Sequence, residues 1–118
     1  MRFEKTNDGY LDNDTGLIWK LEDEIRAYSH EEALKLNGNV WRMPTITELL
    51  GIVEYSRHDP ATFLPNIRPS YYWSASIGAY GLASAGYVDF RKGYTGSGNR
   101  ESSNYVRLVR DTGASNEI

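Results

Sequence analysis

Tyrosine and arginine side chains gather in the loops predicted for the second half of the chain. They lie within or next to two glycine-containing stretches, residues 77–82 and 92–104. Tyr and Arg dominate the energetics of binding interfaces, while Gly, Ser and Asn add adaptable polar contacts. The pattern therefore predicts recognition of a protein or a glycan, and a solvated hairpin without a partner is the alternative interpretation. The side chains predicted to make the contacts are Tyr71, Tyr80, Arg91, Tyr94 and Arg100.

Acidic side chains are concentrated in the first half. Residues 1–60 hold 12 acidic and 7 basic side chains, whereas residues 61–118 hold 4 acidic and 6 basic ones. An acidic surface can occupy a basic nucleic-acid channel. The alternative hypothesis is thus a small intracellular inhibitor encoded by a phage, such as an anti-CRISPR protein, that binds a host nucleic-acid-handling complex. A solvated acidic surface is the ordinary interpretation. The predicted acidic face consists of Glu22, Asp23, Glu24, Glu31 and Glu32, with Asp8, Asp12 and Asp14 as further candidates.

Residue types needed for catalysis or metal binding are scarce. The chain has no cysteine, which excludes thiol nucleophiles, thiolate metal sites and disulfides. His30 and His58 lack the spacing of a metal site, and a Ser-His-Asp triad would have to use these two unrelated positions. The run from Gly93 to Gly98 lacks the Lys-Ser/Thr ending of a phosphate-binding loop. We expect no enzyme, no metal and no cofactor, and the net charge of −3 argues against direct nucleic-acid binding.

Short strands and two helices are predicted to position these side chains. Ser/Thr-x-x-Glu capping boxes predict helices over residues 29–36 and 46–55. Strands are predicted over residues 3–6, 10–12, 17–21, 71–76, 83–91 and 105–110, and loops over 56–70 and 92–104. This order is typical of an α+β domain in which two helices pack on antiparallel strands and the terminal strands pair. No apolar run reaches the roughly 20 residues that span a membrane.

Five ordered motifs carry a family resemblance. Residues 12–19 read Asp-Asn-Asp-Thr-Gly-Leu-Ile-Trp, and residues 40–49 read Val-Trp-Arg-Met-Pro-Thr-Ile-Thr-Glu-Leu. Further along are Tyr-Trp-Ser-Ala-Ser at 72–76, Val-Asp-Phe at 88–90 followed by Gly93, and Val-Arg-Leu-Val-Arg at 106–110. In this order the motifs resemble the Legionella collagen-like protein C-terminal domain family over about residues 8–111.

The resemblance implies a C-type-lectin-like fold, similar to that of formylglycine-generating enzymes. From the length of the chain we expect a single such domain over residues 1–111, followed by a frayed tail over 112–118. Family members occur in bacterial surface, adhesin-like and phage-associated proteins, which implies a binding module whose loops carry the recognition surface. The Glu-Pro-Asn, Gln-Pro-Asp and Trp-Asn-Asp triplets of calcium-dependent lectins are absent, so we expect binding without calcium. Formylglycine-type catalysis requires cysteines, which this chain lacks.

The first residues and the motif side chains complete these expectations. The sequence MRFEKTNDGY lacks a secretory h-region, so we expect a cytoplasmic location for the chain as given. The alternative, for a piece of a longer or processed protein, is the cell exterior or the virion surface. Within the motifs, the three tryptophans are predicted to be core residues, and Arg42 to pair with a carboxylate or cap a carbonyl.

Overall fold

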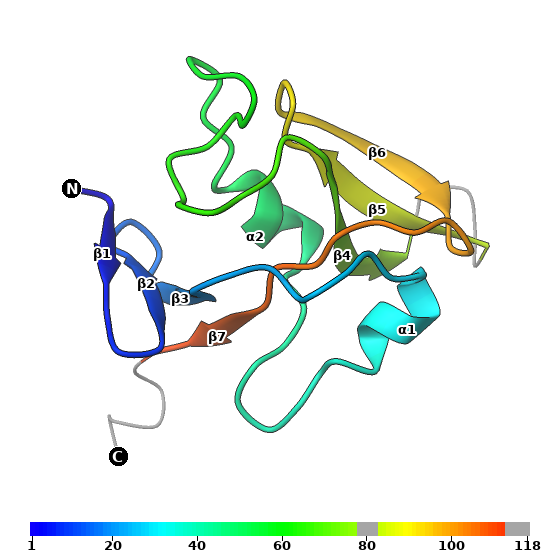
Figure 1. The fold of residues 1–118 in the computed structure, drawn as a ribbon, viewed down its shortest axis with the longest axis horizontal. Coiled ribbons are helices and arrows are strands. Elements are labelled where there is room, and N and C mark those ends of the chain that lie inside the picture. The colour runs from blue at the N-terminus through cyan, green and yellow to red at the C-terminus, as the bar shows by residue number, and fades with distance from the viewer. Residues whose placement is uncertain (78–82, 113–118) are drawn as a thin grey trace.

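Two antiparallel sheets and two short helices make up the part of the chain that the computed structural model describes, residues 1–77 and 83–112 (Figure 1). One sheet has the strand order β1-β2-β3-β7 and the other β4-β5-β6. The strands are β1 (Phe3–Lys5), β2 (Gly9–Asp12), β3 (Leu17–Lys20), β4 (Tyr71–Ile77), β5 (Ser84–Asp89), β6 (Tyr94–Asn99) and β7 (Val109–Asp111). The α+β prediction is confirmed, and β3 pairs antiparallel with β7, which joins the early and late strands as predicted.

Both predicted helices form, and both are shorter than expected. They are α1 (His30–Leu34) and α2 (Ile46–Leu50), and each begins at a complete capping box. In α2 the Thr45 side chain accepts from the Glu48 amide, and the Glu48 side chain accepts from the Thr45 amide. Gly51 is already the C-cap of α2, five residues long, where the prediction ran to residue 55. Helices this short are stable only through packing on the rest of the domain.

The strand β6 corrects the prediction of a long polar loop over residues 92–104. Residues 84–89 of β5 pair with 94–99 of β6 without a break in register. The ring of Tyr87 packs directly over Gly96 and Gly98 of β6. A Cβ at Gly96 would lie 2.8 Å from the Tyr87 hydroxyl oxygen, so the ring needs glycine at this position. A neighbouring strand thus supplies the apolar cover that the β6 sequence lacks, which no local pattern indicates.

The predicted strand over residues 105–110 is also corrected, because β7 begins only at Val109. The segment before β7, residues 105–108, crosses between the two sheets and changes its hydrogen-bond partners on the way. We call it the crossing segment. Tyr105 pairs with β4, where its carbonyl accepts from Trp73 N and its amide donates to Tyr71 O. The carbonyls of the following residues accept from segment 20–24 instead. All four residues from 106 to 109 are buried, so the burial does not alternate as the strand prediction required.

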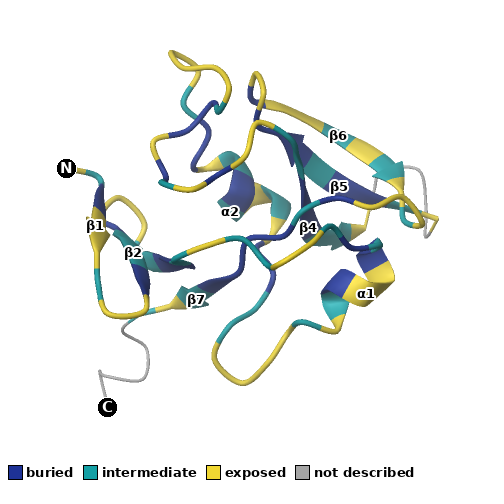
Figure 2. Cartoon of the chain, viewed as in Figure 1, coloured by how far each residue is buried: buried dark blue, intermediate teal, exposed yellow. Residues whose placement is uncertain are grey.

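The core has two hydrophobic clusters. Figure 2 shows the buried residues of the chain in dark blue. The first contains Trp19 and Leu49 and joins the first sheet, α2 and β4–β5. The second contains Trp73 and Met43 and lies between α1, β4–β5 and the crossing segment. Trp19 and Trp73 are fully buried, as predicted. Trp41 is only half-buried, and the cations of Lys20 and Arg110 lie 5.8 and 5.5 Å from its ring.

Candidate functional site

The predicted contact residues Tyr71, Arg91 and Tyr94 lie together on one face of the β4-β5-β6 sheet. Tyr71 is opposite Asp89 in the register, and Asp89 is opposite Tyr94, so their side chains share a face. On the same face the ring of Tyr87 stacks on Tyr71 at a centroid distance of 4.9 Å and an interplanar angle of 16°. We call Tyr71, Tyr87, Arg91 and Tyr94 the aromatic face.

Arg91 is held firmly on the aromatic face. Its Nε and Nη2 atoms donate to the Asp89 carboxylate at 2.9 to 3.2 Å, and Nη2 also donates to the Tyr71 hydroxyl at 2.8 Å. The guanidinium carbon lies 5.1 Å from the centroid of the Tyr71 ring. Burial would raise the pKa of Asp89, but the hydrogen bonds from Arg91 outweigh it and hold this pKa below its ordinary value. A fixed cation of this kind loses little conformational entropy when it binds a ligand.

A hollow of about 260 Å³ opens beside the aromatic face. Its lining is Asp59, Asp89, Arg91, Lys92 and Tyr94. The loop that carries Asp59 is attached to the β5–β6 turn, because the Asp59 amide donates to Arg91 O at 3.0 Å. Tyr94 remains 63% exposed at the rim. Two carboxylates and two cations balance in charge, so the hollow offers both donors and acceptors to an uncharged polar ligand.

The other two predicted contact residues do not join this group. Tyr80 lies outside the described residues. Arg100 follows the far end of β6, roughly 20 Å along the strand from Tyr94. There its Nε donates to Nδ1 of the buried His30 at 3.0 Å, so the Nε2 atom of His30 carries the ring proton and donates to Ser74 O at 2.8 Å. Burial, reinforced by the Arg100 charge, lowers the pKa of His30.

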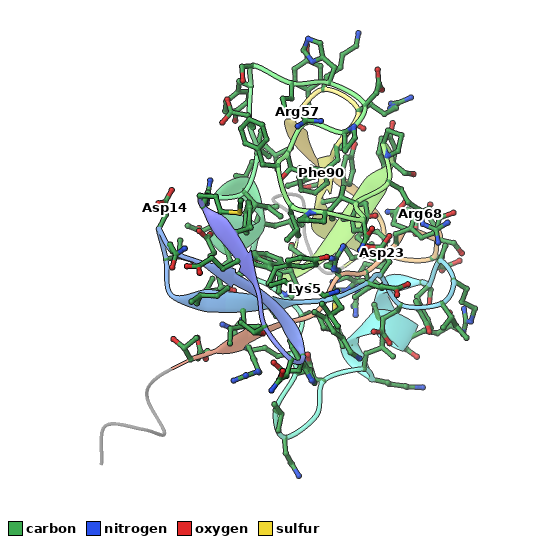
Figure 3. All side chains as sticks on the ribbon, turned by 60° about the vertical axis from the view of Figure 1, so that its left-hand side comes forward. Lys5, Asp14, Asp23, Arg57, Arg68 and Phe90 are labelled. Carbon is green, nitrogen blue, oxygen red and sulfur yellow. The ribbon has the colours of Figure 1, made fainter. Side chains whose placement is uncertain are left out.

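The prediction that Asp23 belongs to an acidic surface is wrong. This carboxylate is buried, with Oδ1 accepting from Arg107 and Oδ2 from Tyr72 and Arg68 at 3.2, 2.5 and 3.2 Å (Figure 3). The fully buried Arg107 donates four further bonds, to backbone carbonyls of residues 20, 21, 65 and 66. Burial, with Asp23 as acceptor, raises the pKa of the Tyr72 hydroxyl far above its ordinary value. Asp23 therefore belongs to an internal network rather than to a surface.

Other members of the acidic face are engaged locally. Glu24 lies 3.2 Å from Lys20 Nζ, and Glu32 lies 3.5 Å from Arg26 while it also caps α1. The further candidate Asp12 is fully buried and forms two hydrogen bonds with Arg2 at 2.9 Å. Exposed members without an ion pair in the described part of the chain are Glu22 and Glu31.

The family motifs prove to be structural where the geometry is described. Arg42 pairs with Glu48 through two hydrogen bonds of 2.7 and 2.8 Å, which confirms the prediction of a carboxylate partner. These bonds lower the pKa of Glu48. In the first motif, Asp12 accepts from the Asp14 amide and the Thr15 hydroxyl, and so closes the turn. These motif side chains therefore hold the fold together, and the predicted contact residues Tyr71, Arg91 and Tyr94 lie outside the motifs.

Sequence reasoning missed three exposed side chains of the loop between α2 and β4. They are Tyr55, Arg57 and Phe63. A proline-rich stretch has no periodicity that separates its buried from its exposed residues, so the only available signal was the residue types themselves.

The described part of the chain is an α+β domain with two antiparallel sheets and an aromatic and arginine surface beside a small polar hollow. The chain belongs to the Lcl C-terminal domain family, whose model matches residues 9–110. Comparison with curated proteins and with solved structures gives no match. The C-type-lectin-like arrangement and the boundary at residue 111 stay predictions, and residues 113–118 of the predicted tail lie outside the described part. No helix among the described residues is long and apolar enough to span a membrane.

Proposed function

We propose that this chain is a non-catalytic recognition domain that binds a protein or glycan partner through its aromatic face without calcium. The observation that carries the proposal is the exposed Tyr94 ring beside the charge-balanced hollow. A flat aromatic ring can cover the apolar face of a sugar, while Asp59 and Lys92 accept from and donate to its hydroxyls. The geometry therefore favours a glycan over a protein at this site.

The rigid support of the aromatic face adds to the proposal. Tyr71 carries both the Tyr87 stack and the Arg91 cation, so three of the four side chains are ordered before a ligand arrives. Preordered contacts favour affinity because binding does not pay for their immobilisation. Calcium independence rests on the missing lectin triplets and is part of the proposal.

The test is a glycan array probed with the wild-type domain and two variants, with and without EDTA. Tyr94→Ala and Arg91→Ala should each weaken binding to the wild type's ligands by about tenfold or more, as expected for an interface hot spot. Arg26→Ala is the matched control, because Arg26 is also an exposed, ion-paired arginine over a tyrosine ring, 4.0 Å from the Tyr28 centroid.

Two results would contradict the proposal, and a third would restrict it to a protein partner. Binding that is equally weakened by Arg26→Ala would place the site elsewhere. Binding that EDTA abolishes would exclude calcium-independent recognition. If the wild type binds no glycan on the array, a glycan partner is excluded, and the same variants are then tested against protein partners. The inhibitor hypothesis has less support, because Asp23 is committed to the internal network with Arg107.

A further inference from the structure

Residues 51–70 connect α2 to β4 without a helix or strand. Loops of this length inside a small domain are uncommon and usually functional. Part of this connection, residues 54–63, stands out from the body next to the β5–β6 turn, and much of its surface is exposed (Figures 1 and 2). We call residues 54–63 the projecting loop.

The projecting loop is fixed at its base. The Glu54 amide donates to Ala61 O at 2.7 Å, which closes the loop on itself. The Ala61 amide donates to Phe90 O at 2.7 Å, which attaches the loop to the end of β5. Ala61, Thr62 and Leu64 are buried. The loop is therefore an ordered platform.

Apolar rings are nevertheless left uncovered on the projecting loop. Tyr55 is 68% exposed and Phe63 is 52% exposed. The guanidinium carbon of Arg57 lies 4.9 Å from the centroid of the Phe63 ring. Trp, Tyr and Arg are the residue types enriched in hot spots, and exposed apolar clusters mark interaction sites. Figure 3 shows Arg57 at the upper end of the molecule.

Arg57 differs from the other arginines in its partners. Seven of them form ion pairs with a carboxylate, and Arg100 donates to His30. Within the described residues, Arg57 has no carboxylate partner. The nearby Glu54 accepts from both the amide and the hydroxyl of Ser56 instead. A partner that matches this surface would therefore present an acidic group surrounded by apolar side chains.

We propose that the projecting loop docks a protein segment in which a carboxylate flanked by apolar side chains pairs with Arg57 and covers Phe63 and Tyr55. This surface adjoins the proposed site, because Asp59 belongs to the projecting loop and also lines the hollow. Its proposed contacts Arg57 and Phe63 do not line the hollow, so the two surfaces can be tested separately. A desolvated arginine–carboxylate pair over an aromatic ring gives specificity for acidic over basic segments.

The experiment uses a library of random linear peptides displayed on phage and selected against the 118-residue chain. Wild type should enrich peptides with Asp or Glu next to bulky apolar residues. Synthetic versions of these peptides should bind Arg57→Glu and Phe63→Ser at least about tenfold more weakly. Arg57→Glu should in turn enrich peptides with Lys or Arg at the same position.

Matched controls separate the surface from general effects. Arg26→Glu reverses another exposed arginine over a ring, and Val40→Ser replaces another exposed apolar residue, 62% exposed. Both should bind the peptides like wild type, and so should Tyr94→Ala, which tests the aromatic face alone. Circular dichroism and thermal melting check that every variant is folded.

Specific results would overturn the inference. They are a selection without enrichment, peptides whose binding is unaffected by Arg57→Glu, and peptides that lose binding to Arg26→Glu equally. Self-association in sedimentation that Phe63→Ser abolishes would identify a second copy of this chain as the occupant and would also overturn it. If the wild-type chain binds the selected peptides but no glycan, only the glycan part of the proposed function is overturned.

Discussion

The buried pair of Arg107 and Asp23 serves the fold. Arg107 is fully buried, and its five N–H groups donate to Asp23 and to four backbone carbonyls. Every donor of the planar guanidinium is therefore used. A residue with this many partners ties the 20–23 segment, the 65–66 segment and the crossing segment to one another.

Replacing Arg107 tests that role. Arg107→Lys should destabilise the domain by about 3–5 kcal/mol, because an ammonium cannot satisfy Asp23 and four carbonyls at once. Arg68→Lys is the control: Arg68 also pairs with Asp23, but its side chain is 51% exposed, so the expected cost is below about 1 kcal/mol. Urea unfolding followed by circular dichroism measures both. Similar losses in the two variants would refute a special role for the buried guanidinium.

His30 should make stability depend on pH. Burial, reinforced by Arg100, lowers the pKa of the native His30, while the unfolded chain takes up this proton near the ordinary value of about 6.5. Below that pH the unfolded state binds more protons than the native state. The free energy of unfolding should therefore fall as the pH decreases below about 6.5, with a limiting slope of about 1.4 kcal/mol per pH unit.

The measurement is urea unfolding across this range. His30→Gln should flatten the dependence, whereas His58→Gln, at an exposed position, should keep it. A wild-type curve that is flat down to about pH 5 would show that native His30 accepts the proton without cost. Carboxylates with lowered pKa values, such as Glu48, contribute only at lower pH.

At the scale of elements, capping decides whether the two short helices form. Thr45→Ala should destabilise the domain by about 1 kcal/mol, because it removes the side-chain acceptor of the Glu48 amide in α2. Thr47→Ala, at an exposed position inside the same helix, should change stability by less than about 0.5 kcal/mol. Urea midpoints compare the two, and an equal effect would exclude the cap as the cause.

Element boundaries were predicted best where a side chain fixes them. Ser29 and Thr45 mark the starts of both helices correctly, because a capping box is a local interaction that the sequence spells out. The end of α2 was missed because Ile52 and Val53 continue the apolar pattern into the core after the helix has ended. Periodicity reports burial, and burial does not require a helix.

The whole molecule should unfold as one unit although it has two core clusters. The crossing segment contributes Val106 and Leu108 to the second cluster, and Val109, the next residue and the first of β7, belongs to the first cluster, so neither cluster can be completed alone. Domains of this size are usually two-state. Circular dichroism and tryptophan fluorescence should therefore give the same urea midpoint.

Core variants sharpen this prediction. Leu49→Ala in the first cluster and Met43→Ala in the second should each cost about 2–5 kcal/mol and lower the common midpoint. Two separated transitions, with Trp19 and Trp73 reporting different midpoints, would show that the clusters unfold independently.

The candidate site was only partly predictable. Tyr71, Arg91 and Tyr94 were identified from residue type, and the structure places them on one face. Asp23 was assigned to a surface because adjacent acids usually face solvent, but its partners are 45, 49 and 84 residues away in the chain. Nothing local distinguishes a carboxylate with such distant partners from a solvated one.

The sequence by itself determined the α+β class, the family and both helix starts. Local patterns predict the elements and the helix caps, and the order of the motifs along the chain identifies the family. Only the tertiary structure decided that residues 94–99 form a strand, that Arg107 and Asp23 are internal, and that Tyr55, Arg57 and Phe63 stay exposed. Each of these depends on which distant segment covers a side chain. That choice minimises uncovered apolar surface and unpaired buried polar groups over the whole molecule, and no short window of sequence contains it.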